Sequence, residues 1–558
     1  MKITGREYTP EFWREVRERE CYKFYREELF GLWESDCTKP IEALRYSDFR
    51  MFKYTGNRTV YQAEYFVRRR GLNTSALLAL IYPEEEKYLV RLMDTIYAIC
   101  DEYTWCLPAH QTALEINNNS HLDLFACETG FALAEIDALL GDRLEPLIRD
   151  RIRVEFDRRV ISSFDAHTFG WERSEANWNA VCSGSLGCAV MLLRPELMEK
   201  YRERLDANIE CYLSGFADDG ICKEGVGYWH YGFGFFTVYA DMLRRFTDGK
   251  VDYFARPKVR TVATFLQKMY LSEGCTVSFS DGGRAVRYQL GLLHYLKNEY
   301  PDDISLPDVK FSYTNDSCGR WCLHMRAALW LREEYLHPEE DEKSLTFFAG
   351  DSEWLVHRSK KFGFAAKAGH NDEPHNQNDV GSFIIAQGGR QIFTDMGSGT
   401  YTRQYFDPAT RYSILPCSSR GHSLPIIGGI YQREGREFAA RSVSFEGGVF
   451  SADIAGAYPI DELRSLCRRF AISDDGVSLT DRYEYDGDGE IIERFVSLAP
   501  PTLVGDGVVE IDGARLCFDA AIATPTFGSE PIRDEFVAYF TDLHLAPGVR
   551  EFSARIKV

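Results

Sequence analysis

The spacing of apolar residues changes character near residue 340, and this change restricts the folds that the chain can adopt. From about residue 10 to 335, apolar side chains recur every three or four positions, which is typical of amphipathic helices. The clearest segments are 11–32, 87–100, 131–140, 188–193, 198–213, 235–246 and 259–271. Such a series predicts a helical bundle, a solenoid or a closed α/α toroid, and periodicity alone leaves all three open.

From about residue 345 onward, glycine-rich turn signals follow one another at short intervals. Between and beyond them lie short strand-like runs at 390–393, 442–445, 477–480 and 535–540. Short strands with regular turns predict a β-sandwich. The charged, proline-containing segment 336–343 is the expected linker, so we predict a helical domain at 1–335 and a β-domain at 345–558.

Composition limits the partners. The formal net charge of −20 argues against nucleic acid or an anionic membrane, because nothing would offset phosphate repulsion. No run of 18 apolar residues exists, so no membrane span is expected. The first residues lack the apolar core of a secretory signal, and the 15 cysteines form no C-x-x-C pair, which predicts reduced thiols and a cytoplasmic protein. Whether the chain forms a homo-oligomer is left open.

Residues 369–383 form an unusually polar stretch between two predicted strands at 362–366 and 383–386. The ten positions from His370 to Asp379 contain two His, four Asn or Gln and three acidic residues. A tight turn does not need so many hydrogen-bonding side chains. This stretch therefore predicts a site for a polar substrate or a metal.

Four stretches of the helical half are also unusually polar for their setting, at 105–111, 121–130, 177–182 and 224–232. Each places an amide, acid, His or Tyr next to aromatic and small residues. Helix capping and core packing explain any one of them. Four in one chain, each near an end of a predicted helix, favour a shared cleft. The high aromatic content, 14%, suits helical cores and also the stacking floor of a sugar-binding cleft.

Asp395 closes a predicted strand, and His422 lies in a later loop. Together with His375 and Gln377 they could supply metal ligands, since Zn²⁺ accepts imidazole nitrogen and carboxylate oxygen. The alternative is that Asp395 caps a turn and that His422 is an ordinary loop residue. Spacing alone slightly favours this alternative.

The stretch 369–383 resembles the heparinase II/III-like lyases of acidic polysaccharides, whose signature is of the type H-N-H-N-D-x-G-S-F. The segments 177–179 and 224–231, Asp395-Met396-Gly397 and His422 follow the order of the family's other landmarks. The resemblance covers roughly residues 80 to 430 and implies an incomplete α/α toroid followed by an antiparallel β-sandwich. It also implies β-elimination on uronic-acid glycans, in which the C5 proton is removed and the oxygen on C4 leaves.

The same resemblance implies roles for individual residues. Asn177 holds the substrate carboxylate, with Asn179 as the fallback. Tyr228 is the acid and also a candidate base, and Tyr231 is its rival because the register of the aromatic run is uncertain by a few positions. His375 is the base or the charge stabiliser. Further expected contacts to an acidic oligosaccharide come from His110, Trp178 and Glu224 in the polar stretches described above. Independently of the resemblance, Arg403, Arg411 and Arg420 lie near the signature and could bind an acidic sugar, or could serve only surface solubility.

One position departs from the family's signature. The family's second signature His, a ligand of a structural Zn²⁺, is Gln377 here, while Asp395 and His422 match the other two ligand positions. Since an amide oxygen is a poorer zinc ligand than imidazole, the metal site is weakened, recruits a donor such as His370 or Asp379, or is absent.

Two other functions compete with a lyase. A glycoside hydrolase would need two carboxylates flanking the scissile bond, for which Glu128, Glu224 and Asp281 are candidates. A catalytically silent sugar-binding protein is the third hypothesis, and the change at Gln377 is its best argument.

Overall fold

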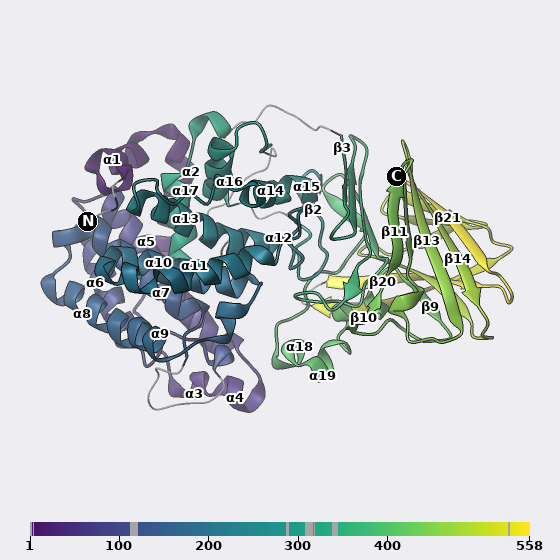
Figure 1. The fold of residues 1–558 in the computed structure, drawn as a ribbon, viewed down its shortest axis with the longest axis horizontal. Coiled ribbons are helices and arrows are strands. Elements are labelled where there is room, and N and C mark those ends of the chain that lie inside the picture. The colour runs from purple at the N-terminus through teal and green to yellow at the C-terminus, as the bar shows by residue number, and fades with distance from the viewer. Residues whose placement is uncertain are drawn as a thin grey trace.

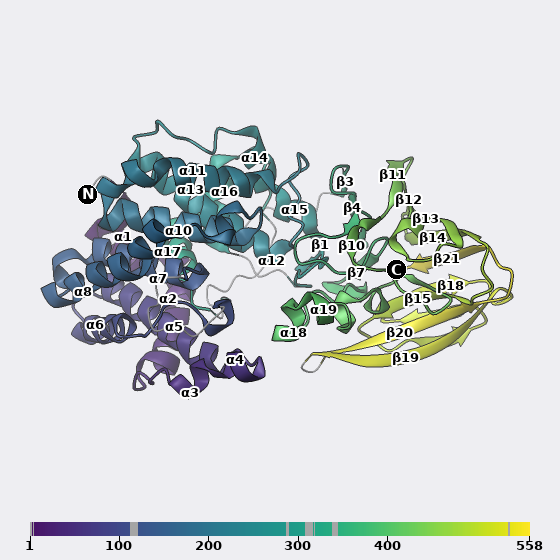
Figure 2. The ribbon, with the colours of Figure 1, turned by 60° about the horizontal axis from the view of Figure 1, so that its bottom comes forward.

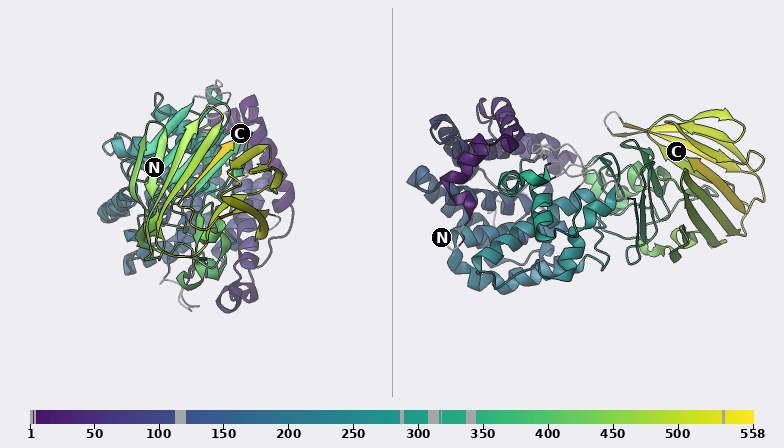
Figure 3. Two further views of the ribbon diagram at one scale, coloured as in Figure 1. Left: turned by 90° about the vertical axis from the view of Figure 1, so that its right-hand side faces the viewer. Right: turned by 90° about the horizontal axis from the view of Figure 1, so that it is seen from above.

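The computed structural model describes residues 3, 5–111, 121–285, 289–306, 316, 318–336, 344–533 and 536–558. It has a helical part formed by the N-terminal residues and a β-part formed by the C-terminal residues, which lie end to end (Figures 1 and 3). This confirms the predicted multi-domain α+β architecture. Among the described residues, no helix is long and apolar enough to span a bilayer.

The helical part contains all but two of the labelled α-helices. They are α1 (Pro10–Glu18), α2 (Lys23–Leu32), α3 (Tyr46–Phe49), α4 (Met51–Thr55), α5 (Thr59–Ile81), α6 (Glu86–Cys100), α7 (Leu124–Leu140), α8 (Pro146–Phe156), α9 (Ser162–Ala166), α10 (Asn177–Leu193), α11 (Met198–Ser214), α12 (Val226–Tyr228), α13 (Gly234–Phe246), α14 (Pro257–Ala263), α15 (Phe265–Met269), α16 (Leu290–Glu299) and α17 (Trp321–Leu329).

Helices α7 and α10 are buried on nearly all sides, because apolar or small residues fill almost every position. Asp123 caps α7 by accepting a hydrogen bond from the Ala126 N–H at 2.8 Å. Gly187 of α10 lies where an added Cβ atom would come within 2.4 Å of the Tyr239 ring on α13, so glycine permits this close packing. Because α10 contacts α7, α11 and α13, and α17 contacts α5, α7 and α13, the inner helices form an incomplete α/α toroid.

The β-part is a sandwich of antiparallel sheets. One sheet has the order β11-β12-β13-β14-β21-β18-β17-β16, and the other has the order β19-β20-β15-β8-β7-β5-β4-β3, with β9 paired to β15. Their strands are β3 (Leu345–Ala349), β4 (Trp354–Arg358), β5 (Gly363–Lys367), β7 (Phe383–Gln387), β8 (Arg390–Phe393), β9 (Pro425–Ile427), β11 (Arg441–Glu446), β12 (Val449–Asp453), β13 (Leu463–Ser473), β14 (Gly476–Tyr485), β15 (Ile491–Ser497), β16 (Thr502–Gly505), β17 (Val508–Ile511), β18 (Ala514–Phe518), β19 (Ala523–Arg533), β20 (Phe536–Leu545) and β21 (Glu551–Lys557).

The sheet that contains β4, β5 and β7 has apolar side chains on both faces, because one face packs against the helical part and the other against the second sheet. Successive side chains of a strand point to opposite faces. One set joins the core of the helical part, namely Trp354, Val356, Ala365, Ile384 and Ala386. The alternating set joins the core of the sandwich, namely Leu355, Phe364, Ala366, Phe383 and Ile385. The two parts therefore share a continuous apolar contact through this sheet.

Several predicted elements differ in detail from the structure. The run 11–32 is broken at Arg19, whose extended backbone (φ −72°, ψ 140°) separates α1 from the 3₁₀ turn before α2. The run 259–271 ends in a strand, β1 (Tyr270–Ser272), which pairs with β2 (Cys275–Thr276). The predicted strand at 390–393 coincides with β8. Beyond Leu336, the predicted linker at 336–343 lies outside the described residues.

Candidate active site

A cleft of about 910 Å³ lies where the helical part meets the loops that follow β8. Two short helices, α18 (Arg403–Phe406) and α19 (Pro408–Arg411), form its wall on the β-side. Helix α18 lies beside α4 (Figure 2), and Arg403 donates hydrogen bonds to the Phe52 and Lys53 carbonyl oxygens across the mouth. Aromatic rings line much of the cleft, namely Phe52, Phe66, Phe125, Trp178, Tyr228, Tyr231, Tyr401 and Phe406.

His375 enters this cleft from the polar loop after β6 (His370–Asn371). Its backbone has φ 57°, a left-handed conformation that non-glycine residues adopt rarely and that functional sites often contain. Its Nδ1 atom donates to Asp281 at 2.6 Å, and its Nε2 atom lies 3.4 Å from Glu224. Burial alone would lower the pKa of His375, but the hydrogen bonds and charges of these two carboxylates raise it to about 9. The imidazole is therefore held as a cation.

Asp281 connects His375 with two tyrosine hydroxyl groups. Its fully buried carboxylate accepts hydrogen bonds from His375, from the Tyr401 hydroxyl at 2.9 Å and from the Tyr405 hydroxyl. Burial would raise the pKa of Asp281, but the hydrogen bonds of His375 and Tyr405 and the charges of His375 and Arg411 hold it below its usual value. Asp281 therefore stays ionised and fixes the orientation of the imidazole.

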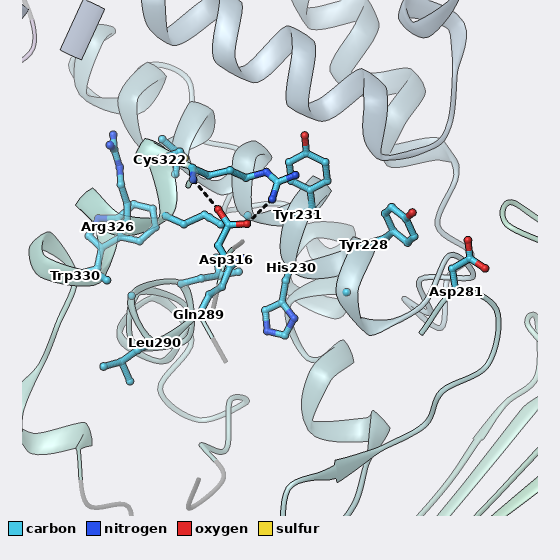
Figure 4. A pocket seen from close by; sticks show the side chains of 18 of the residues that line it. Tyr228, His230, Tyr231, Asp281, Gln289, Leu290, Asp316, Cys322, Arg326 and Trp330 are labelled. Atoms are coloured by element: carbon cyan, nitrogen blue, oxygen red, sulfur yellow. Dashed lines mark hydrogen bonds and ion pairs between the residues drawn. The ribbon is translucent and has the colours of Figure 1, made fainter. Parts of the chain in front are cut away.

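The two tyrosines of the aromatic run meet different partners. The Tyr228 ring stacks on His375, with ring centroids 4.1 Å apart, and its hydroxyl shares a 2.7 Å hydrogen bond with the Tyr401 hydroxyl. Burial and then the charge of Asp281 raise the pKa of Tyr228. Tyr231 donates directly to the Glu128 carboxylate. In Figure 4, Tyr228 lies between Tyr231 and Asp281.

Asn177 stands at the first position of α10 and lines the cleft. Its backbone N–H and its side-chain amide donate to the two Glu224 oxygens, while its Oδ1 atom is buried with no hydrogen-bond partner. Gly225 (φ 103°) brings the loop of Glu224 close to that of Asp281, since an added Cβ atom would lie 3.0 Å from the Gly282 backbone. The glycine residues thus place Glu224 and Asp281 on either side of His375.

Glu128 forms a second acidic centre at the other end of the cleft. Its Oε2 atom lies 3.4 Å from Nε of Arg320, whose guanidinium is 4.1 Å from the centroid of the Tyr231 ring and 2.6 Å from Asp316. Burial raises the pKa of Glu128 to about 7, against the lowering effect of Arg320 and Tyr231.

A buried polar cluster lies behind the cleft. The side chains of Asp379, Asp395 and His422 bring ligand atoms within 4.8 Å of one another. His422 Nδ1 faces Asp395 at 3.1 Å, while its Nε2 atom donates to the Pro416 carbonyl oxygen at 3.0 Å. A hydrogen bond of this kind fixes the tautomer of a metal-ligating histidine.

Gln377 lies beside this cluster, because it donates to the carbonyl oxygen of Gly397, whose N–H donates to Asp395 at 2.8 Å. Its Nε2 atom donates to the carbonyl oxygens of Ser280 at 2.6 Å and Gly397 at 3.0 Å, which leaves its buried Oε1 atom without a hydrogen-bond partner. Buried polar atoms are rarely left unsatisfied, so the unpaired Oε1 atom of Gln377 is suited to be a ligand of a cation. Lys367 lies against the cluster and places Nζ 2.8 Å from Asp379. Of the two substitute donors considered from the sequence, Asp379 belongs to the cluster, whereas His370 lies apart in β6 and accepts a hydrogen bond from the Asp372 N–H.

Several solved structures share the fold of this chain. Heparinase III matches with a TM-score of 0.63 and 13% identity, over 100% of this chain and 92% of that chain. Heparan sulfate lyase HepC from Pedobacter heparinus matches with a TM-score of 0.59 and 13% identity, over 98% and 85%. The chondroitin AC lyase of Streptomyces coelicolor A3 matches with a TM-score of 0.57 and 11% identity, over 98% and 82%. The fold is that of heparinase-like lyases.

The resemblance seen in the sequence is thereby confirmed at the level of the heparinase-like fold. Neither the family models nor the curated proteins that were searched give a match.

The cleft brings together most of the predicted site residues. Asn177, Trp178, Tyr228, Tyr231, His375 and His110 all line it, and Glu224 lies directly behind Asn177 and His375. His110 Nδ1 donates to the Asp123 carboxylate at 2.8 Å, and its ring makes an edge contact with Trp178 at 4.9 Å between centroids. The positions of the lining residues agree with roles at a substrate, which remain predictions. Glu224 was predicted as a substrate contact but does not line the cleft, and its carboxylate is bound to Asn177 and His375, so it is a supporting residue.

Two further predicted substrate contacts bind backbone carbonyl oxygens of the protein in this structure. Asn179 is fully buried, and its amide nitrogen donates to the Ser174 and Glu172 carbonyl oxygens. Arg411 donates twice to the Asn376 carbonyl oxygen, at 2.9 and 2.8 Å, and once to the Tyr405 carbonyl oxygen at 3.0 Å. We therefore correct both to supporting residues, since their donors hold backbone and neither side chain lines the cleft.

Sequence reasoning missed Tyr401 and Arg320 and considered Asp281 only as a hydrolase carboxylate. A signal for Asp281 exists in the Ser280-Asp281-Gly282-Gly283 turn, where an acid precedes two glycine residues. Tyr401 follows the equally polar Gly397-Ser398-Gly399-Thr400 stretch. Nothing in their spacing shows that both meet His375 or Tyr228.

Proposed function

We propose that this protein is a lyase that cleaves uronic-acid-containing oligosaccharides by β-elimination. The observation that carries the proposal is His375, held between two carboxylates and stacked on Tyr228 within an aromatic cleft that Asn177 also lines. The solved structures with the same fold are lyases of heparan sulfate and chondroitin, which supports an acidic glycan as the substrate.

His375 and Asn177 would neutralise the substrate carboxylate. Abstraction of the C5 proton builds negative charge on that carboxylate, and a fixed cation stabilises this charge most effectively in a site that excludes water. Both ring nitrogens of His375 face carboxylates, so the imidazole holds its protons and is poorly suited to accept another. We therefore assign His375 as the charge stabiliser and not as the base. Asn177 adds an amide N–H beyond the one donated to Glu224.

Tyr228 would then move the proton. Burial and the charge of Asp281 raise the pKa of Tyr228, while the Tyr401 hydrogen bond and the charge of Arg58 lower it. The Tyr228 hydroxyl loses its proton to solvent before the reaction, with Tyr401 donating a hydrogen bond to the phenolate. The phenolate takes the C5 proton, the C4–O bond breaks as the C4–C5 double bond forms, and Tyr228 gives that proton to the leaving oxygen. Tyr228 is left as the phenolate for the next substrate. Tyr231 is less suited, because its hydroxyl is already bound to Glu128.

A glycoside hydrolase is the second candidate, and Glu128 is the observation that favours it. A carboxyl group with a pKa of about 7 suits a general acid at neutral pH. However, Asp281 and Glu224, the other two carboxylates, are both engaged with His375. A hydrolase would leave that ion cluster without a role.

We further propose that Gln377, Asp379, Asp395 and His422 hold a structural divalent cation such as Zn²⁺. The donor set is one nitrogen and several oxygens, which Zn²⁺ accepts. When bound, the cation would tie the loop of His375 to the loops after β8 and before β9. It has no part in the proton transfers described above.

The product decides between the candidates. The protein would be incubated with a panel of uronic-acid oligosaccharides while ultraviolet absorbance and reducing ends are recorded. A lyase gives an absorbing conjugated double bond, and Tyr228→Phe should abolish it, while Tyr97→Phe at an exposed position of α6 should not. Reducing ends without absorbance would favour the hydrolase. Neither signal would favour a sugar-binding protein without catalysis.

A further inference from the structure

We infer that Arg58 and Arg403 form a second anion subsite of the cleft, which takes a carboxylate or sulfate group on the sugar next to the reacting uronate. This inference rests on the proposed lyase function and concerns the same cleft. Its basis is that these two guanidinium groups form no ion pair among the described residues, whereas Arg320, the third one that lines the cleft, is bound to Asp316 at 2.6 Å and Glu128 at 3.4 Å.

Arg58 is a cation whose neighbours are uncharged. Its Nη2 atom lies 3.5 Å from His110 Nε2, which carries the lone pair because His110 Nδ1 donates to Asp123. Its guanidinium lies 5.9 Å from the centroid of the Phe406 ring. Burial lowers the pKa of Arg58, so this group has lost part of its hydration. A cation that has lost hydration without gaining a counter-charge is stabilised by a bound anion.

Arg403 lies on the β-side of the cleft mouth, in α18. Its Nη2 atom donates to the carbonyl oxygens of Phe52 and, at 2.9 Å, of Lys53. Carbonyl oxygens orient a guanidinium, but they leave its positive charge uncompensated. A guanidinium has five N–H donors, and within the described ranges the Nε and Nη1 atoms of Arg403 have no hydrogen-bond partner. Donors therefore remain for a ligand.

The two guanidinium groups belong to one contact between the helical part and α18. An added Cβ atom at Gly56, two residues before Arg58, would lie 3.2 Å from the Arg403 Cβ atom and 3.9 Å from its Nε atom. Phe406, which faces Arg58, is in the same short helix as Arg403. Two like charges on one contact repel each other, and an anion bound to both removes that repulsion.

The carboxylates around the cleft do not occupy this subsite. Asp407, which lines the cleft near Arg403, accepts a hydrogen bond from the Ala409 N–H at the start of α19 and forms no ion pair among the described residues. Glu128 is bound to Arg320 and Tyr231 at the other end of the cleft. The mouth therefore has local positive charge although the net charge of the protein is −20.

The subsite lies beside the reacting centre. The charge of Arg58 lowers the pKa of Tyr228, and both residues line the cleft. The carboxylate of the reacting uronate is assigned to Asn177 and His375, so Arg58 and Arg403 are left for an anion on a neighbouring sugar. Guanidinium groups bind planar carboxylates and tetrahedral oxyanions through two parallel hydrogen bonds, so carboxylate and sulfate share the required chemistry.

The test compares oligosaccharides of equal length that differ in one group. The hexosamine C6 hydroxyl of heparosan or chondroitin oligosaccharides would be left free, sulfated or oxidised to a carboxylate, and initial ultraviolet rates would give kcat/KM for each form. We expect a charged C6 group to raise kcat/KM by roughly tenfold, the size of one charge-assisted contact. An increase with one anion alone would support the subsite and identify its ligand. No increase with either anion would overturn the inference.

Variants test which residues carry the preference. Arg58→Gln and Arg403→Gln should each remove most of the ratio between charged and uncharged forms, and Arg58→Lys, which keeps a cation, should retain part of it. Arg464→Gln, at an exposed position of β13 in the sandwich, is the matched control and should leave the ratio unchanged. If Arg58→Gln lowers the rate equally for all three forms, Arg58 acts on the reacting uronate or on the structure, and the subsite is contradicted.

Failure of the lyase proposal is separable from failure of this inference. If no form gives absorbance, β-elimination is contradicted, and calorimetry with the same three forms still tests the subsite. Tighter binding of a charged form by the wild type, lost in Arg58→Gln, would support it. Equal affinities of the wild type for all three forms would overturn it.

Discussion

The two ends of the cleft contain the same kinds of residue in opposite electrical settings. At one end Tyr228 is bonded to a neutral hydroxyl and stacked on the His375 cation; at the other Tyr231 is bonded directly to the Glu128 carboxylate. These tyrosines are three residues apart in one aromatic run. Burial and the charge of Asp281 raise the pKa of Tyr228, against the Tyr401 hydrogen bond and the charge of Arg58, whereas burial and the bonded Glu128 carboxylate raise the pKa of Tyr231. The proposed roles of the two tyrosines therefore depend on their partners and not on the residue type.

The largest expected effect comes from removing each hydroxyl in turn. Tyr228→Phe should lower kcat by roughly 10²–10⁴-fold, the usual contribution of a positioned acid or base. Tyr231→Phe should lower it much less, because this hydroxyl binds Glu128 and is not free for the substrate. Initial ultraviolet rates measure both. Equal losses in the two variants would show that the two ends do not differ in the way proposed.

The variant Tyr401→Phe tests whether the hydrogen bond between Tyr401 and Tyr228 contributes to catalysis. Without this hydroxyl, Tyr228 loses the hydrogen bond that lowers its pKa, and we expect kcat to fall by roughly tenfold. Tyr405→Phe is the matched control, since it also removes a hydrogen bond to Asp281 but leaves the Tyr228 contact intact. The pH profile of kcat should change in Tyr401→Phe alone. The same profile in both variants would reduce Tyr401 to a packing residue.

The sequence predicted the parts of this site that lie close together in the chain. The loop 369–383, Asn177 and the aromatic run at 224–232 were each identified and do meet in one cleft. The contacts that give them their roles span long separations, 94 residues for His375 with Asp281 and 173 for Tyr228 with Tyr401. Spacing cannot predict such contacts, because they depend on how the helical part docks on the sheet.

The fold was predictable for a different reason. Apolar periodicity records burial along each element, so helices such as α6 and strands such as β8 follow from local pattern. The errors fall where local pattern is interrupted by backbone geometry, as at Arg19 between α1 and α2. Asn179 and Arg411 were misassigned because a polar side chain that holds backbone has the same appearance in sequence as one that holds a ligand.

Removal of a bound metal should lower the thermal stability of the protein. If the cluster of Gln377, Asp379, Asp395 and His422 holds a cation, a chelator should lower Tm by several degrees, and elemental analysis should find the metal in the untreated protein. Gln377→His supplies a better zinc ligand and should increase the zinc-dependent rise in Tm. No metal in the protein, and a Tm that does not respond to chelator in either variant, would contradict the site.

The smallest expected effect concerns the pH dependence of stability at the Tyr231 end. Burial raises the pKa of Glu128 from 4.5 to about 7, so between these values the folded protein holds a proton that the unfolded chain has lost. Proton binding by the folded state means that this group's contribution to stability falls as pH rises through that window and is constant above it. Glu128→Gln should remove this part of the slope, so that the Tm difference between variant and wild type grows from about pH 4.5 to about pH 7 and then levels off. Glu27→Gln, at an exposed position of α2, is the matched control and should give a constant difference. Parallel curves for Glu128→Gln and wild type would show that Arg320 keeps Glu128 ionised throughout, and the two ends of the cleft would then differ in geometry but not in protonation.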